Sequence, residues 1–345
     1  MTAIRTGIIG YGLSGRIFHS PFIAANPAFS LDVISTANEA RAQQAREQHP
    51  SATVVATPDE LLDSELDLVV LASPAHVHLE QAQAAIAAGI AVVIDKPFAA
   101  SVAEATRIIE ASEDAGVPLT VYQNRRWDGD FRTVRTLLDE GVLGRVHRFE
   151  STFERWSPAL RERWQDTTPT SEGAGITFDL GSHLVDQALQ LFGPATLEAA
   201  ELSVLREGGV SDDESFLSLL HENGVRSHLT MSRYAAQNAP RFRVLGSASG
   251  YTVQGLDGQE PALMAGAQPN DPGFGDVPED RWGLLGITGS AEVPPTPYPT
   301  ERGDYAAFYA GVAAALRDGT AMPVDPHDAL AALDLIEQAH RRTGI

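Results

Sequence analysis

Lys96 is the only lysine among the 25 lysine and arginine residues of this sequence. An ammonium group on a flexible stem can shift its pKa and exchange protons, whereas a guanidinium stays charged. Lys96 follows the apolar run 91–94 and precedes Pro97, so we expect it at the carboxyl edge of a parallel sheet, where such folds bind ligands. This position indicates a chemical task, although a solvated or ion-paired lysine kept by chance would give the same composition.

A second group of chemically active side chains recurs at helical spacing in the C-terminal half. Asp179 and His183 are four residues apart and Asp186 follows three residues later, on one face of a predicted helix that ends at Gly193. A neighbouring carboxylate orients an imidazole and favours its charged form, as a base near neutral pH requires. The alternative is an ordinary ion pair on a helix surface. No further ligand stands at suitable spacing nearby, so we expect no metal site.

A glycine-rich loop follows the first apolar run of the chain. Residues 4–9 predict a buried strand, and a helical segment to about residue 25 begins after the sequence Gly10-Tyr11-Gly12-Leu13-Ser14-Gly15. In such a loop the first glycine permits the turn, the second lets the backbone approach a pyrophosphate, and the third lets the helix pack on the strand. The helix N-terminus offers N–H groups to the phosphates. The sequence therefore predicts a dinucleotide site, with a glycine turn that binds nothing as the alternative.

The end of the second strand carries no carboxylate for the ribose hydroxyls of NAD, and has instead Ser35, Thr36, Ala37 and Asn38. These small groups, together with Arg41, favour the 2′-phosphate of NADP without excluding NAD.

Two further segments follow strands at the same edge and are expected to contact the cofactor: Ser73, Pro74 and His78, then Asn124, Arg126 and Trp127. Arg125 is expected to contact substrate. His78 could instead begin a helix, and the two arginines could form an ion-paired hinge with Asp128.

These residues must be positioned by strands and helices, and the pattern over residues 1–123 predicts a Rossmann domain. Strands are expected at 4–9, 31–36, 53–56, 66–72, 91–94 and 119–122, with helical patterns between them. Such alternation predicts a doubly wound parallel sheet. Capping-box sequences at 57–60 and 101–104 mark the starts of two helices, and Gly89 and Gly116 mark the ends of two.

Residues 124–345 predict an α+β substrate and oligomerisation domain with a large, mostly antiparallel open sheet. After a helix to residue 138, strands are expected at 146–153, 197–205, 215–220, 225–234 and 242–246, loops at 256–283 and 293–299, and helices at 304–317 and 326–341. Apolar residues, including Leu229 and Met231, alternate with polar ones. We expect one face of the sheet to pack helices. The other face is expected to carry Leu or Met side chains at alternate positions and to join a second subunit in a dimer or tetramer.

Composition excludes several classes of partner. The net charge of −21 would repel nucleic acid and anionic membrane surfaces. No apolar run is long enough to span a bilayer and the N-terminus has no signal-like pattern, so a cytoplasmic protein is expected. The chain has no cysteine, which excludes disulfides, thiolate metal sites and thiol catalysis.

Three motifs together resemble the Gfo/Idh/MocA oxidoreductase family over nearly the whole chain: the glycine loop, Asp95-Lys96-Pro97, and Asp179-x-x-x-His183-x-x-Asp186. Within that family, the glycine loop and segments 122–128 and 257–260 are most similar to the NADP-dependent scyllo-inositol dehydrogenase branch. The resemblance implies that Asp95 helps to bind the cofactor. The family usually has Glu at this position, and the branch often has Arg where this chain has Ala37.

The resemblance implies an NAD(P)-dependent dehydrogenase that acts on a secondary alcohol of a cyclic polyol or sugar. His183 would remove the hydroxyl proton, Asp179 would orient His183, and Lys96 would bind and polarise the same oxygen while a hydride passes to the nicotinamide. The alternatives are an aldose 1-dehydrogenase, a keto-sugar reductase, or a protein that senses NADP without turnover. A sensor would have no need of these proton-transfer residues.

Overall fold

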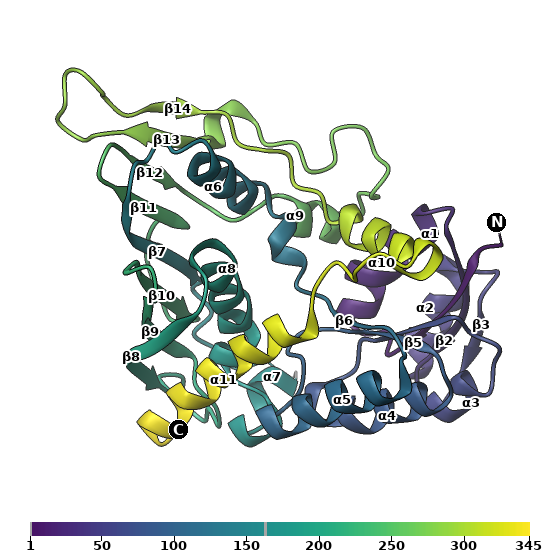
Figure 1. Ribbon diagram of the computed structural model, residues 1–345. Coiled ribbons are helices and arrows are strands. Elements are labelled where there is room, and N and C mark those ends of the chain that lie inside the picture. The colour runs from purple at the N-terminus through teal and green to yellow at the C-terminus, as the bar shows by residue number, and fades with distance from the viewer. Residues whose placement is uncertain (1, 162–163) are drawn as a thin grey trace. The chain divides into compact units, whose positions relative to one another are not determined.

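The computed structural model describes residues 2–161 and 164–345, which form two compact units (Figure 1). Unit 1 contains the chain up to Asn124 together with Glu260–Phe274 and Tyr305–Leu330. Unit 2 contains Arg125–Gln259, Gly275–Asp304 and Ala331–Ile345. The sequence predicted one boundary, between residues 123 and 124, and gave no sign that two later segments return to unit 1.

Unit 1 is built on a sheet of six parallel strands in the order β3-β2-β1-β4-β5-β6. The strands are β1 (Ile4–Ile9), β2 (Phe29–Ser35), β3 (Thr53–Val55), β4 (Leu68–Leu71), β5 (Ala91–Ile94) and β6 (Leu119–Val121). Every residue of β4 and β5 is buried, as expected for strands with helices on both faces. The strand order reverses between β1 and β4, so the carboxyl ends of these strands mark the expected ligand site. The Rossmann prediction is confirmed.

The helices of unit 1 begin and end close to the predicted residues. They are η1 (Gly15–His19), α1 (Ser20–Ala25), α2 (Glu39–Gln48), α3 (Pro58–Leu62), η2 (Ala75–Val77), α4 (His78–Ala87), α5 (Val102–Ala115) and α10 (Ala306–Asp318). Thr57 and Glu60 form the predicted capping box. Ser101 accepts from the Glu104 N–H, but the Glu104 carboxylate accepts from Ala100 N–H, so the second box is incomplete. Among the described residues, three elements span boundaries between the units: η3 (Asn124–Trp127), α9 (Gln259–Met264) and α11 (Pro326–Thr343).

Unit 2 is built on an eight-stranded sheet in the order β14-β13-β12-β11-β7-β10-β9-β8, in which only the pair β7 and β10 is parallel. The strands are β7 (Val146–Glu154), β8 (Ala195–Ser203), β9 (Glu214–His221), β10 (Arg226–Ser232), β11 (Phe242–Gly246), β12 (Gly250–Val253), β13 (Gly283–Gly286) and β14 (Thr296–Tyr298). The mostly antiparallel sheet is confirmed. Strands β12 to β14 were not predicted, since each has four residues or fewer.

One face of this sheet packs against helices. The remaining helices are α6 (Gly129–Asp139), α7 (Trp164–Thr167), η4 (Thr170–Glu172), η5 (Thr177–Gly181), α8 (Ser182–Phe192), η6 (Glu279–Arg281) and α11 (Pro326–Thr343), the last of which begins in unit 1. Leu229 and Met231 are fully buried on the helix-covered side. The other side of β10 has Arg226, His228 and Thr230. In β10 the expectation that Leu or Met side chains would occupy the open face was therefore wrong, although Leu220 of β9 lies on that face opposite Arg226. No helix within the described residues could cross a membrane.

Candidate active site

The glycine loop of unit 1 has no room for side chains at its first and third glycines. Gly10 has a φ of +96°, and a Cβ placed on it would lie 2.7 Å from the carbonyl oxygen of Ala72, at the end of β4. A Cβ on Gly15 would collide with the Gly10 carbonyl oxygen. The backbone therefore makes the close turn that a dinucleotide pyrophosphate requires. The glycine loop therefore fits the dinucleotide that the motif predicts.

The side chains of this loop point in different directions. Tyr11 is buried, and its hydroxyl donates to Gln48 Oε1 at 2.7 Å, which ties the loop to α2. Leu13 is exposed. Contacts of the loop with phosphates would therefore be made by main-chain N–H groups.

Arg41 lies over the glycine loop from the first turn of α2. Its Nη1 is 3.7 Å from the position that a Cβ on Gly12 would occupy. Ser35 is buried at the end of β2, and Asn38 caps α2 by accepting from the Arg41 N–H at 3.0 Å. The predicted contact from the Asn38 side chain therefore competes with its cap. Strand β2 begins at Phe29, two residues before the predicted start at residue 31, so Asp32 lies in the middle of the strand.

The segment after β4 is held by its own hydrogen bonds. Ser73 donates its hydroxyl to Gln81 Oε1 at 2.6 Å. His78 begins α4, as one reading of the sequence predicted, and is completely buried. Its ring nitrogens lie 2.9 Å from the Ser73 carbonyl oxygen and 3.1 Å from that of Phe98, and burial lowers its pKa. His78 thus braces the loop, and its contact with a cofactor stays a prediction, as does that of Pro74.

Asp95 and Lys96 follow β5 at the same edge. The Asp95 Oδ1 accepts from the Lys96 main-chain N–H at 2.8 Å, and the Lys96–Pro97 peptide is cis. Burial alone would raise the pKa of the Asp95 carboxyl, but His19 and Lys96 hold that pKa below its ordinary value. His19, which the sequence reading missed, comes from η1.

Asp179 and His183 belong to unit 2 and sit on either side of a change in helix type. Asp179 lies in the π-helical turn η5, and His183 lies in the first turn of α8. The uniform α-helix predicted through both residues was therefore wrong at Asp179. The carboxylate of Asp179 accepts a charged hydrogen bond from Arg233, which follows β10. Arg233 was not predicted, because 54 residues separate it from Asp179.

The turn that carries Asp179 is anchored from beneath by a buried carboxylate. Asp212 Oδ2 accepts from the Thr177 main-chain N–H at 2.8 Å and from the hydroxyl groups of Thr177 and Ser215. All three residues are buried. These bonds fix the start of η5 to the beginning of β9, so the turn that contains Asp179 is held by contacts separate from the one with Arg233.

Asp186 forms a two-pronged ion pair with Arg126. The Arg126 Nε and Nη2 donate to the two Asp186 oxygens at 2.9 and 2.6 Å, and both residues are buried. Arg125 donates to Asp128 at 3.3 Å. Both arginines are ion-paired, but only Arg125 pairs with Asp128 as predicted, since the partner of Arg126 is Asp186. Contacts of Asn124, Arg125, Arg126 and Trp127 with cofactor or substrate stay predictions.

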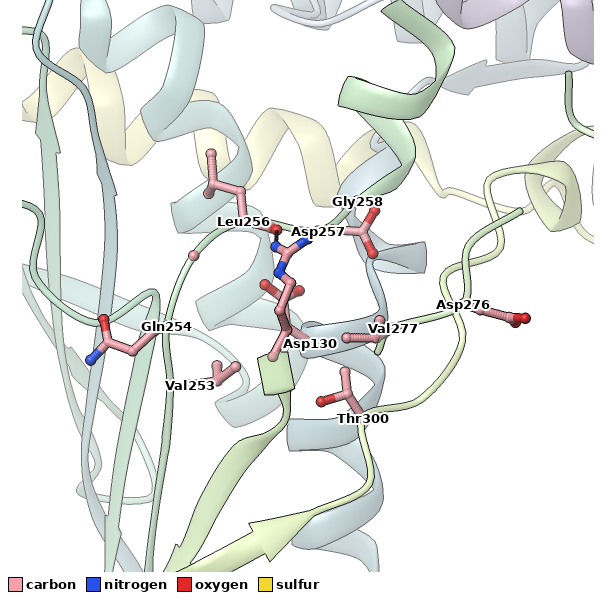
Figure 2. A pocket seen from close by; sticks show the side chains of 11 residues that line it. Asp130, Val253, Gln254, Leu256, Asp257, Gly258, Asp276, Val277 and Thr300 are labelled. Atoms are coloured by element: carbon pink, nitrogen blue, oxygen red, sulfur yellow. Dashed lines mark hydrogen bonds between the residues drawn. The ribbon is translucent and has the colours of Figure 1, made fainter. Parts of the chain in front are cut away.

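A separate cavity in unit 2 is too small for a dinucleotide cofactor or for a sugar-sized substrate. Figure 2 shows it between Asp130, Asp257 and Thr300, and its volume of about 20 Å³ is enough for about one water molecule. Burial, with the nearby charge of Asp257, raises the pKa of Asp130 to about 6 against the opposing effect of Arg241. Within residues 2–161 and 164–345, no cluster of three or more His, Cys, Asp or Glu side chains could hold a metal.

Both halves of the chain match models of one protein family. Residues 4–123 match the oxidoreductase family with an NAD-binding Rossmann fold, and residues 131–252 match the GFO/IDH/MocA C-terminal domain. The scyllo-inositol 2-dehydrogenase (NADP(+)) IolW of Bacillus subtilis is 35% identical over 338 residues, which cover 97% of this chain and 92% of IolW. The chain belongs to the Gfo/Idh/MocA oxidoreductase family. This Gfo/Idh/MocA protein is thus an NAD(P)-dependent dehydrogenase, as the motifs predicted.

Two further comparisons agree with this family assignment. The solved structure of the oxidoreductase yvaA from Bacillus subtilis has a TM-score of 0.93 and 31% identity, and the match covers 99% of this chain and 96% of that one. D-apiose dehydrogenase of Paraburkholderia graminis is 35% identical over 184 residues, or 51% of this chain and 46% of that enzyme. The Gfo/Idh/MocA assignment therefore rests on sequence and on fold.

Proposed function

We propose that this Gfo/Idh/MocA protein transfers a hydride between NADP and a secondary alcohol of an inositol-like polyol or sugar. The observation that carries the proposal is the position of Lys96, the only lysine, directly after β5 at the edge that also holds the glycine loop. The substrate class is supported by two relatives, a scyllo-inositol 2-dehydrogenase and a D-apiose dehydrogenase.

Each proposed catalytic residue has one task. The ammonium of Lys96 donates to the substrate oxygen and stabilises the negative charge that develops on it. The imidazole of His183 accepts the hydroxyl proton, and Asp179, held by Arg233, favours the charged imidazole that results. When bound, the nicotinamide supplies the hydride acceptor. In the reverse direction His183 returns the proton to a ketone oxygen.

The preference for NADP rests on the charges around the end of β2. A carboxylate at this position would repel a 2′-phosphate, and residues 35–38 contain none. Arg41 lies above Gly12, where its guanidinium can pair with a phosphate oxygen. Ala37 provides no charge, so one arginine rather than two favours NADP.

The test is absorbance of the reduced nicotinamide during turnover. The purified protein is mixed with NAD or NADP and with a panel of inositols, aldoses and, in the reverse direction, inososes. Oxidation of at least one inositol with NADP is the expected result. Turnover of aldoses alone would contradict the inositol-like substrate and support the aldose 1-dehydrogenase alternative. Cofactor binding without turnover on any member would support the NADP sensor.

A further inference from the structure

A buried histidine lies behind the Asp95-Lys96 motif in unit 1. His19 has no exposed surface, and its Nε2 lies 3.8 Å from Asp95 Oδ1. Its Nδ1 is 2.7 Å from the hydroxyl oxygen of Tyr309 in α10. Among the described residues no atom forms a hydrogen bond with Nε2. The Asp95 carboxylate lies within ion-pair distance of this nitrogen. We call His19, Asp95 and Tyr309 the His19 cluster.

The surroundings of the ring settle which nitrogen carries a proton. A lone pair on Nε2 would face the Asp95 carboxylate and be repelled, so Nε2 carries hydrogen. In the neutral ring Nδ1 then accepts from the Tyr309 hydroxyl. Burial raises the pKa of Tyr309 well above its ordinary value, so the phenol keeps the proton that it donates. The ring of Tyr122 lies 4.4 Å from that of His19, centre to centre, and limits its rotation.

The cluster ends on the main chain of the proposed catalytic lysine. The same Asp95 oxygen that faces His19 accepts from the Lys96 N–H at 2.8 Å. An aspartate is one methylene shorter than a glutamate, so its carboxylate stays close to its own backbone and can fix the next residue. We propose that His19 is a positioning residue, which holds Asp95 and through it the backbone of Lys96. The inference rests on the proposed function, because it assigns His19 a task only if Lys96 acts on substrate.

Loss of the His19 side chain should lower turnover without weakening cofactor binding, whereas a general loss of stability would affect both. A displacement of about 1 Å at a reacting group can cost on the order of 10²-fold in rate. His19→Ala is therefore expected to lower kcat by about ten- to a hundred-fold while the Kd of NADPH stays within about two-fold. His19→Gln, whose amide can donate to Asp95, should recover most of that loss. Because His19 acts through Asp95, His19→Ala should have little further effect in an Asp95→Asn background.

A second measurement does not depend on activity. Since Lys96 is the only lysine, protein labelled with carbon-13 at the lysine ε carbon gives one resonance for this position. His19→Ala should shift or broaden that resonance. The matched control is Ser112→Ala, which removes another buried hydrogen bond of unit 1, from the Ser112 hydroxyl to the Val117 carbonyl oxygen. Its resonance and kcat should equal those of the parent.

The outcomes separate the two proposals. A parent protein that oxidises no polyol or sugar contradicts the proposed function, whatever the resonance does. An unmoved Lys96 resonance in His19→Ala, or a kcat equal to that of an active parent, overturns the role of His19. Equal losses from His19→Ala with and without Asp95→Asn overturn it as well. If His19→Ala does not fold, Tyr309→Phe removes only the hydroxyl and should change the resonance in the same way.

Discussion

Proton transfer at single residues is where the proposed activity can be tested most directly. Lys96 is assigned a hydrogen bond to the substrate oxygen, for which the planar guanidinium of arginine has a different geometry, and His183 is assigned a proton-accepting task, which asparagine cannot perform. Conservative substitutions at these two positions therefore separate chemistry from cofactor binding.

Lys96→Arg should keep the Kd of the cofactor and lose turnover by ~10² to 10⁴-fold. Arginine retains the charge, but its larger planar head group cannot place a donor on the substrate oxygen in the way that the compact ammonium of Lys96 does. Stopped-flow fluorescence measures cofactor binding, and steady-state absorbance measures kcat. A variant whose kcat is within a few-fold of the parent would rule out this role of Lys96.

For His183→Asn we expect a comparable fall in kcat at neutral pH. The rate should rise again at high pH, because hydroxide can then remove the substrate proton in place of the imidazole. The measurement is kcat from pH 6 to 10 for both proteins. Full activity of the variant at neutral pH would show that His183 is only structural.

The raised pKa of Asp130 predicts that the stability of the protein, rather than its activity, depends on pH. Its pKa is raised to about 6 from the ordinary 3.8, so the folded state binds the proton more tightly than the unfolded state. The resulting stabilisation is complete below pH 3.8 and is lost as pH rises through about 6. Relative to Asp130→Asn, the parent should lose up to about 3 kcal/mol of unfolding free energy between pH 4 and 7. Urea denaturation of both proteins at several pH values measures this, and parallel curves would contradict it.

At the scale of elements, the sequence predicted those parts whose pattern is local. β4 and β5 are continuous apolar runs, and the glycine loop has its required strand before it. β12 to β14 have short sequences with glycines or prolines, and their register comes from β11, which no local pattern reveals. The π-helical turn at Asp179 was missed because a spacing of four reads as an α-helix. Its geometry depends on Asp212, which is far along the chain.

The junction of β2 and α2 should set cofactor choice. We expect kcat/KM to favour NADP over NAD by about ten-fold, from neutral hydrogen bonds and one arginine. Arg41→Ala should remove most of this preference, whereas Ala37→Arg should deepen it by roughly another ten-fold through a charge-assisted bond. The control is Arg46→Ala, an exposed arginine on the same helix that pairs with Glu39. A parent that favours NAD by more than ten-fold would show that the end of β2 is not the ribose site.

At the scale of the whole molecule, the groups that no sequence pattern indicated are those brought together from distant segments. His19 and Tyr309 are 290 residues apart, and Arg233, which follows β10, is 54 residues from its partner Asp179. Residue types and spacing predicted Lys96, Asp179 and His183 as site residues, since each stands in a local motif. The residues that hold them have no motif of their own, because their partners come from tertiary contacts.

Association of the protein is a prediction at this scale. The open face of the second sheet has Phe216 packed near His228 and mixed charges, Arg148, Glu150 and Arg243, which could pair with a second copy. We expect light scattering to give a mass at least twice the 36.9 kDa of the chain. Phe216→Glu should weaken this assembly, with Glu207→Gln as a charge-altering control off this face. A mass of one chain at every concentration would refute the prediction.

The path of the chain through its two units limits how such enzymes can be recombined. Each unit is assembled from three separate segments, so a cut after Asn124 does not release unit 1 intact. A chimera joined there would take His19 from one parent and Tyr309 from the other. Exchange of unit 1 between relatives should therefore succeed only when residues 260–274 and 305–330 are transferred together with residues 1–124. A functional cofactor-binding unit thus requires coding sequence from three separate parts of the gene.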